Sequence, residues 1–293
     1  MTVLKTIFLG LVHGLTEFLP LSSSGHMSFY CKVMKTDGNS GDFLDILLHM
    51  ATLVAVIIYF REDIVNMFRE FGKMMMTIFA NLLVFISKRR GDNRYTYFKV
   101  VDTAYKKLII MIILSMIPTT ILGIVGQELV LLAESSLWFV GICFIVTAAL
   151  MLLTDRHEDG TLRIREAPFS SGILMGIAQG VSILPGLSRT GSTIAMGIFL
   201  GYNNKLAVKY SFIMSIPAIL GSIVYKLIRY KGIGFDRGLI PGYFFAMVIA
   251  GVLGYFTIKF IMKFVQKKRY IGFSVYCLAM GIASIIFSIV SSK

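Results

Sequence analysis

The stretch EFLPLSSSGH, residues 17–26, sets the fold of this chain because it places many polar groups directly after an apolar run. A glutamate, a proline, three serines, a glycine and a histidine follow Ile7–Val12, in a chain of mean hydropathy +0.77. Irregular polar backbone persists at membrane depth only where protein buries it or where it lines a wet cavity. We therefore interpret this stretch as a broken, re-entrant turn that faces a cavity.

The composition places the chain among helical membrane proteins. Of its 293 residues, 56% are hydrophobic and 15% are charged, whereas soluble domains carry about 25% charged residues. Several uncharged windows approach the roughly 20 apolar residues that cross a bilayer: Leu108–Gly126, Leu137–Leu153, Leu239–Ile258 and Tyr270–Val290. The sequence lacks the short alternating segments of a membrane β-barrel. We expect an all-α, polytopic membrane protein.

Charge and cysteine usage agree with this class. The formal net charge is +13, and Lys and Arg gather between apolar windows, as they do in cytoplasmic loops. We therefore expect membrane lipids, and no nucleic acid, as partners of the basic surface. The three cysteines are widely separated and predict packing roles rather than a disulfide. No small-residue cleavage site follows the first apolar run, so we expect no cleaved signal peptide.

The polar stretch recurs in the second half of the chain. Slid against itself by 166 residues, the chain aligns Gly10 with Gly176, Gly14 with Gly180, Leu21 with Leu187, Ser22 with Ser188 and Gly25 with Gly191. The second copy contains PGLSRTGST, residues 185–193, which again combines proline, glycine and hydroxyl groups. A shared offset of this kind predicts two related halves, as in many transporter-like folds.

Basic residues predict that the second half is inverted. Residues 71–87 are apolar but have Lys and Arg on both flanks, which favours an interfacial or cytoplasmic helix over a span. Six spans remain, three in each half: roughly 43–60, 108–126, 137–153, 206–229, 239–262 and 270–290. An odd number of crossings between the two motifs turns the second copy upside down. We predict one domain, residues 1–293, with two re-entrant helical hairpins in an inverted repeat (about 1–107 with 108–153, and 168–293).

The two turns carry different chemistry. The first offers Glu17, Ser23 and His26, and ionisable residues inside a membrane are costly and usually functional. The second offers Arg189 among hydroxyl groups and Gly186. An arginine fork and the N–H groups at a half-helix start bind phosphate oxygens. Facing each other, the turns would form one composite site with the groups that phosphoryl transfer needs.

Structural roles are the alternative for some of these residues. Ser22 and Ser24, taken singly, are better explained as helix caps. Glu17 could pair with His26, or with Arg189 in the absence of substrate.

His13 lies four residues before Glu17, so both share one face of a helix and could bind a divalent metal. His13 could equally form a hydrogen bond within the bundle. The similarly spaced Asp45 and His49 are interpreted as structural, and His157 as solvated.

The motifs resemble those of a known family. GLTEFLPLSSSGH and PGLSRTGST are similar to the two signature motifs of the undecaprenyl-diphosphate phosphatases linked to bacitracin resistance, and YSFIMSIPAILGSIVY resembles the helix after the second motif. The resemblance covers nearly the whole chain. It implies a multi-pass protein of the bacterial cytoplasmic membrane that hydrolyses undecaprenyl diphosphate to undecaprenyl phosphate and inorganic phosphate. That reaction recycles the lipid carrier of peptidoglycan synthesis.

The resemblance also implies a site open to the extracytoplasmic side, a polyprenyl diphosphate substrate and a divalent cation, Mg²⁺ or Ca²⁺. Matched to the motifs, the catalytic residues are Glu17, Ser23, His26 and Arg189. The diphosphate-binding residues are Gly186, Ser188, Arg189 and Thr193, and the metal ligands are Glu17 and His13. The family usually has Glu or Gln where His13 stands, so the metal identity is open. Also open are the nucleophile (Ser23, His26 or water) and association as a homo-oligomer.

A transporter is the main alternative. Inverted repeats with broken helices are typical of secondary transporters, and the same cradle could carry a polyprenyl phosphate or another anion, as a flippase does, without cleaving it. A purely structural scaffold leaves Glu17, His26 and Arg189 without a role. Phosphate release in detergent, where no two sides exist, separates catalysis from transport.

Overall fold

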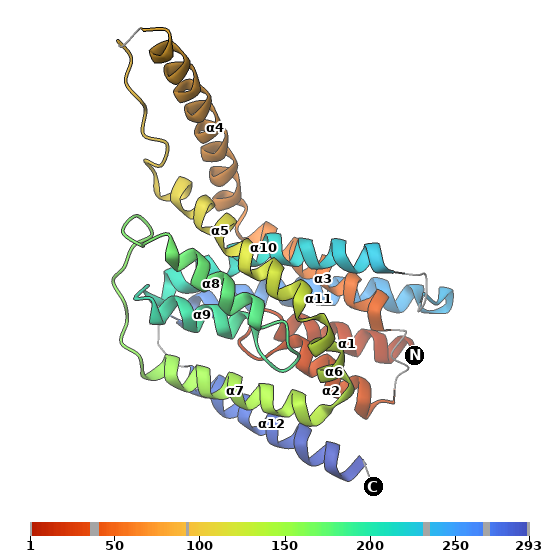
Figure 1. Cartoon of the computed structure of the whole chain (residues 1–293). Coiled ribbons are helices and arrows are strands. Elements are labelled where there is room, and N and C mark those ends of the chain that lie inside the picture. The colour runs from red at the N-terminus through yellow and green to blue at the C-terminus, as the bar shows by residue number, and fades with distance from the viewer. Residues whose placement is uncertain (1, 36–40, 92–93, 231–234, 266–269, 292–293) are drawn as a thin grey trace.

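The computed structural model describes residues 2–35, 41–91, 94–230, 235–265 and 270–291, and these ranges are helical almost throughout (Figure 1). They contain no β-strand. The helices are α1 (Val3–Thr16), α2 (Ser23–Val33), α3 (Gly41–Tyr59), α4 (Arg61–Arg89), α5 (Ala104–Val125), α6 (Gln127–Ser135), α7 (Leu137–Arg156), α8 (Ser170–Val181), α9 (Arg189–Phe199), α10 (Asn204–Arg229), α11 (Ile240–Phe264) and α12 (Ile271–Ser291). The predicted all-α membrane fold is confirmed.

Among the described residues, six helices are long and apolar enough to cross a membrane. Five of them, α5, α7, α10, α11 and α12, correspond to predicted spans. The remaining helix, α4, also has the length and composition of a span, but we predicted that it lies outside the bilayer. Only 11% of its apolar window is buried, and Figure 1 shows it projecting away from the bundle. The predicted span at 43–60 is α3, which packs against α10 and α11.

The sequence repeat is a repeat of helix packing. The first helix of each hairpin lies along a long helix of the other half: α1 along α11, and α8 along α5. Glycines make both contacts close. A Cβ atom on Gly10 would lie 2.6 Å from the Cα of Ala246, and one on Gly176 would lie 2.1 Å from the carbonyl oxygen of Ser115. These two glycines are 166 residues apart in sequence, and each lets the first helix of its hairpin approach the backbone of a long helix in the other half.

The two hairpins have opposite directions. Figure 1 shows that α1 and α2 enter from the end of the bundle that holds the N-terminus, while α8 and α9 enter from the other end. On one side of the bundle, α7 contacts α2 and α9 and packs along α12 (Figure 1). A Cβ atom on Gly141 would lie 2.8 Å from the carbonyl oxygen of Gly281, and the reverse distance is also 2.8 Å. This reciprocal contact agrees with the predicted inverted arrangement, whereas the residue boundaries of the two repeats remain a prediction.

The position of residues 71–107 relative to the bilayer is a testable prediction. In a cysteine-free background, Glu62→Cys and Tyr95→Cys should resist an impermeant thiol reagent added outside intact cells, because basic residues flank the apolar part of α4 at both ends. Ser135→Cys, at the end of α6 in the connection expected outside, is the labelled control. Tyr95 is an exposed residue just after α4, whereas Asp92 lies outside the described residues. Labelling at Glu62→Cys would make α4 a span and the repeat parallel.

Candidate active site

The same capping contact builds both hairpin turns. Ser22 precedes α2, and its hydroxyl oxygen accepts the Gly25 N–H at 3.3 Å. Ser188 precedes α9, and its hydroxyl oxygen accepts the Gly191 N–H at 3.0 Å. Both the acceptors and the donors are related by the 166-residue offset, and each contact satisfies an N–H that a helix start leaves without a partner. The predicted capping role of Ser22 is confirmed, whereas Ser24 lies inside the first turn of α2.

The two turns contact each other directly. The Gly186 N–H donates to the Ser22 hydroxyl at 3.1 Å, and the Thr190 hydroxyl donates to the Glu17 carbonyl at 3.1 Å. A Cβ atom on Gly25 would lie 2.7 Å from the Cα of Gly186. Gly186 also has a φ of +96°, which favours glycine. A side chain at either position would push the turns apart, so the close approach of the two turns requires glycine at both.

An ion pair joins the charged groups of the two turns. Nη2 of Arg189 lies 2.7 Å from Oε1 of Glu17, and the Ser23 hydroxyl donates to Oε2 of the same carboxylate. The Glu17 side chain is 4% exposed and the Arg189 side chain is 20% exposed. The guanidinium has five N–H donors, and one of them makes this contact. Arg189 can therefore bind an anion from its accessible side while it remains paired with Glu17.

His26 is held at both ring nitrogens. Nδ1 lies 2.8 Å from the Ser22 carbonyl oxygen, which only accepts, so Nδ1 carries the proton. Nε2 of the neutral ring then accepts from the Tyr276 hydroxyl at 2.8 Å. The Tyr276 ring stacks on His26, and Phe144 meets the imidazole edge to face. The alternative pairing of His26 with Glu17 is therefore wrong. Sequence reasoning missed Tyr276, which has no polar motif around it in α12.

The other residues predicted to bind diphosphate form hydrogen bonds within the protein. The Ser188 N–H donates to the Thr147 hydroxyl at 3.0 Å, and the Thr147 hydroxyl donates to the Gly186 carbonyl at 2.9 Å. The Thr193 hydroxyl donates to the Arg189 carbonyl at 2.8 Å. These contacts shape the turn that presents the arginine. Direct phosphate binding by Gly186, Ser188 and Thr193 remains a prediction.

His13 lies beside the Glu17 carboxylate, as the helical spacing predicts. The two side chains approach to 3.6 Å between Nε2 of His13 and Oε2 of Glu17. The histidine is 1% exposed, and neither ring nitrogen has a hydrogen-bond partner in the described part of the chain. The alternative, a hydrogen bond of His13 within the bundle, is thus not found there. A buried imidazole without a partner, next to a carboxylate, fits the donors that a divalent cation uses. Metal binding by this pair remains a prediction.

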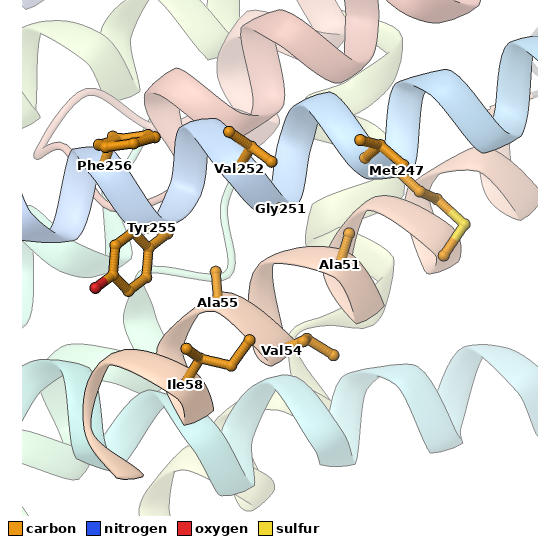
Figure 2. Close-up of a pocket in the computed structure, with 10 residues that line it drawn as sticks. Ala51, Val54, Ala55, Ile58, Met247, Gly251, Val252, Tyr255 and Phe256 are labelled. Carbon is orange, nitrogen blue, oxygen red and sulfur yellow. The ribbon is translucent and has the colours of Figure 1, made fainter.

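An apolar groove lies between α3 and α11 (Figure 2). Its volume is about 550 Å³, and its walls include Val54 and Ile58 of α3 and Val252 and Phe256 of α11. All four side chains are at least half exposed. The same two helices flank the site: α3 carries Asp45 and His49, and α11 packs along α1, which carries His13.

The fold and the two turns define an integral membrane protein whose polar site is assembled from two inverted hairpins inside a helical bundle. The family model described as Bacitracin resistance protein BacA matches residues 6–283, and the chain belongs to this family. It is 34% identical over 294 aligned positions to an undecaprenyl-diphosphatase of Alkaliphilus metalliredigens, covering 99% of this chain and 100% of that protein. It is 33% identical over 290 positions to an undecaprenyl-diphosphatase of Methanosphaera stadtmanae, covering 98% and 99% of the two chains. The expected family is confirmed.

Replacement of Arg189 tests the composite site. Arg189→Ala should lower the rate of phosphate release about 10²–10³-fold, the usual loss when one preorganised electrostatic contact is removed. Arg189→Lys should restore little, because an ammonium group lacks the planar fork of the guanidinium. Turnover with a polyprenyl diphosphate in detergent is the measurement.

The matched control is Arg165→Ala, which removes an exposed arginine outside the site and should leave turnover unchanged. Near wild-type turnover of Arg189→Ala, with an unaltered melting temperature and elution volume, would show that the two turns do not form one catalytic site.

Proposed function

We propose that this protein hydrolyses undecaprenyl diphosphate, releasing inorganic phosphate and leaving undecaprenyl phosphate for reuse in peptidoglycan synthesis. The observation that carries the proposal is the contact between Arg189, Glu17 and Ser23 across the two turns. Its support includes full-length similarity to proteins named undecaprenyl-diphosphatases. Bacitracin resistance, the property in the family description, is the cellular effect we expect.

The helix starts supply the phosphate site in this proposal. Ser23 is the first residue of α2 and Arg189 is the first residue of α9. The first N–H groups of a helix lack intrahelical partners and carry partial positive charge, so both helix starts attract an anion. Arg189 adds a bidentate contact to the terminal phosphoryl group. Together they would stabilise the negative charge of the transition state.

Ser23 is the nucleophile that the geometry favours. Its hydroxyl already donates to the Glu17 carboxylate, so Glu17 can take the proton as the oxygen attacks the terminal phosphorus. The bond from phosphorus to the bridging oxygen then breaks, undecaprenyl phosphate leaves, and water releases phosphate from the serine. His26 is the second candidate, but the Tyr276 hydroxyl must first leave its Nε2. When bound near Glu17, a divalent cation supplies further neutralisation of the diphosphate.

The substrate tail belongs in the apolar groove between α3 and α11. The groove is walled by exposed aliphatic and aromatic side chains, and its two helices lead to the polar site. Burial of each tail CH₂ contributes about 0.8 kcal/mol, although a tail in lipid already gains most of this. We therefore expect the groove to select chain length and position rather than to provide the affinity.

We place the protein in the bacterial cytoplasmic membrane, with the site open to the extracytoplasmic side. The support is the distribution of charge: residues 127–136 lack Lys and Arg, whereas residues 154–167 carry three arginines. The motifs of the two hairpins would then meet from opposite faces. Whether copies associate as a homo-oligomer remains open.

Phosphate release in detergent micelles tests the function. Purified protein should release inorganic phosphate from undecaprenyl diphosphate and, less efficiently, from farnesyl diphosphate. Val54→Trp, which fills the groove, should raise the KM for the long substrate several-fold and affect the short one less. The control is Ile57→Trp, an exposed position of α3 that is not among the groove residues. Transbilayer movement of the lipid without phosphate release would instead identify a transporter.

A further inference from the structure

Three side chains that can ligate a metal lie together next to the proposed catalytic residues. His13 of α1 and Asp45 and His49 of α3 each place one ligand atom within 4.8 Å of the others. The two imidazole rings meet edge to face with their centroids 4.8 Å apart, and Nδ1 of His49 lies 3.3 Å from Oδ1 of Asp45. Asp45 and His49 are four residues apart, as are His13 and Glu17, but in the first pair the acidic residue precedes the histidine. Only the fold brings the two pairs together.

We propose that His13, Asp45 and His49 form a binding site for a divalent transition-metal ion beside the Glu17 carboxylate. His13 provides the independent evidence, because it is buried and both its ring nitrogens lack hydrogen-bond partners within the described residues. A bound metal ion would be the missing partner of one of these ring nitrogens.

The orientation of His49 suits a metal ligand. Its Nδ1 lies 2.8 Å from the Asp45 carbonyl oxygen, so this nitrogen carries the proton and Nε2 keeps its lone pair. Histidine ligands of metals usually donate their second ring N–H in this way, to a backbone carbonyl or a carboxylate. His49 is therefore already in the tautomer and the ring orientation that ligation requires.

The donor set predicts which metal binds. Two imidazoles and one carboxylate match the protein ligands of open zinc sites and suit zinc, cobalt or manganese. Magnesium and calcium prefer all-oxygen ligands. Glu17 is left out of the proposed set because its oxygens contact Arg189 and Ser23, which are the reacting groups of the proposed function. In this arrangement Glu17 acts with the reacting groups, and His13, Asp45 and His49 bind the metal.

The charges around the cluster predict that metal and substrate bind cooperatively. Glu17 is paired with Arg189, and Asp45 is paired with Lys226 of α10. These two carboxylates and two cations sum to zero net charge. A divalent cation alone would leave two positive charges in a buried site, and a diphosphate would neutralise them. Each ligand should therefore raise the affinity for the other by the same factor; this part rests on the proposed function.

Cobalt is the probe that reads the site without relying on activity. The full-length protein, stripped with a chelator in detergent, should bind one Co²⁺ per chain and develop the visible absorption of cobalt with nitrogen ligands. A large excess of Mg²⁺ should not displace it. His49→Ala should lower the Co²⁺ affinity at least tenfold, whereas His157→Ala, at an exposed histidine, should not.

A second variant keeps the test independent of folding defects. His13→Glu should retain the fold but shift the preference away from Co²⁺ and toward Mg²⁺ or Ca²⁺, since one imidazole becomes a carboxylate. Methylene diphosphonate, a non-hydrolysable diphosphate, should lower the Kd for free Co²⁺ at least tenfold in the wild-type protein, with the Co²⁺ that the diphosphonate chelates in solution subtracted from the total.

Equal Co²⁺ binding by the wild type, His49→Ala and His13→Glu would overturn the proposed metal site, even if the protein hydrolyses its substrate. Site-specific Co²⁺ binding without phosphate release would leave the metal site intact and overturn the proposed function. An unchanged Co²⁺ affinity with methylene diphosphonate would overturn the cooperative binding.

Discussion

A carboxylate buried inside a membrane protein requires a partner of opposite charge, and the way in which Glu17 obtains one determines how the two halves of this protein fit together. An isolated ion in such a place costs several kcal/mol, and the counter-charge here is Arg189, 172 residues later in the chain. Because the two residues come from different halves, the turns of their hairpins must meet, and the hairpins reach this meeting point from opposite ends of the bundle (Figure 1). The close glycine contacts of α1 with α11, of α8 with α5 and of Gly25 with Gly186 make that meeting sterically feasible.

The same contact explains why the two halves repeat in packing but not in chemistry. Both turns use a serine cap and a glycine donor, at Ser22–Gly25 and Ser188–Gly191, so the local backbone is duplicated. At the first position of the following helix, one copy has Ser23 and the other has Arg189. The proposed nucleophile and the proposed anion-binding group thus stand at equivalent positions of the two repeats. Only their combination gives a site that can both hold a phosphoryl group and attack it.

The residue patterns of the two motifs were sufficient to predict the two turns. The contacts between residues far apart in the sequence could not be predicted in this way. The motifs identified Glu17, Ser23 and Arg189, which the structure brings into contact, because each stands beside a helix break with a fixed spacing. Tyr276 was missed, since a tyrosine in an apolar span has no local signature and reaches His26 only through the α7–α12 pair. Asp45 and His49 were interpreted as structural because nothing in their own segment points to His13. Length and hydropathy also cannot distinguish α3 from α4 as a span; the structure adds that α3 packs against α10 and α11, whereas only 11% of the apolar window of α4 is buried.

If the two turns act as one catalytic unit, changes at Glu17 and Arg189 must be coupled, and a double-mutant cycle on phosphate release measures this coupling. Glu17→Gln, Arg189→Gln and the double variant should be measured in one detergent with undecaprenyl diphosphate, with folding checked by thermal denaturation. We expect strong coupling: the double variant should be about as slow as the slower single variant, because either change disables the same unit. Losses that multiply, so that the double variant is slower by the product of the two single effects, would show that Glu17 and Arg189 act independently.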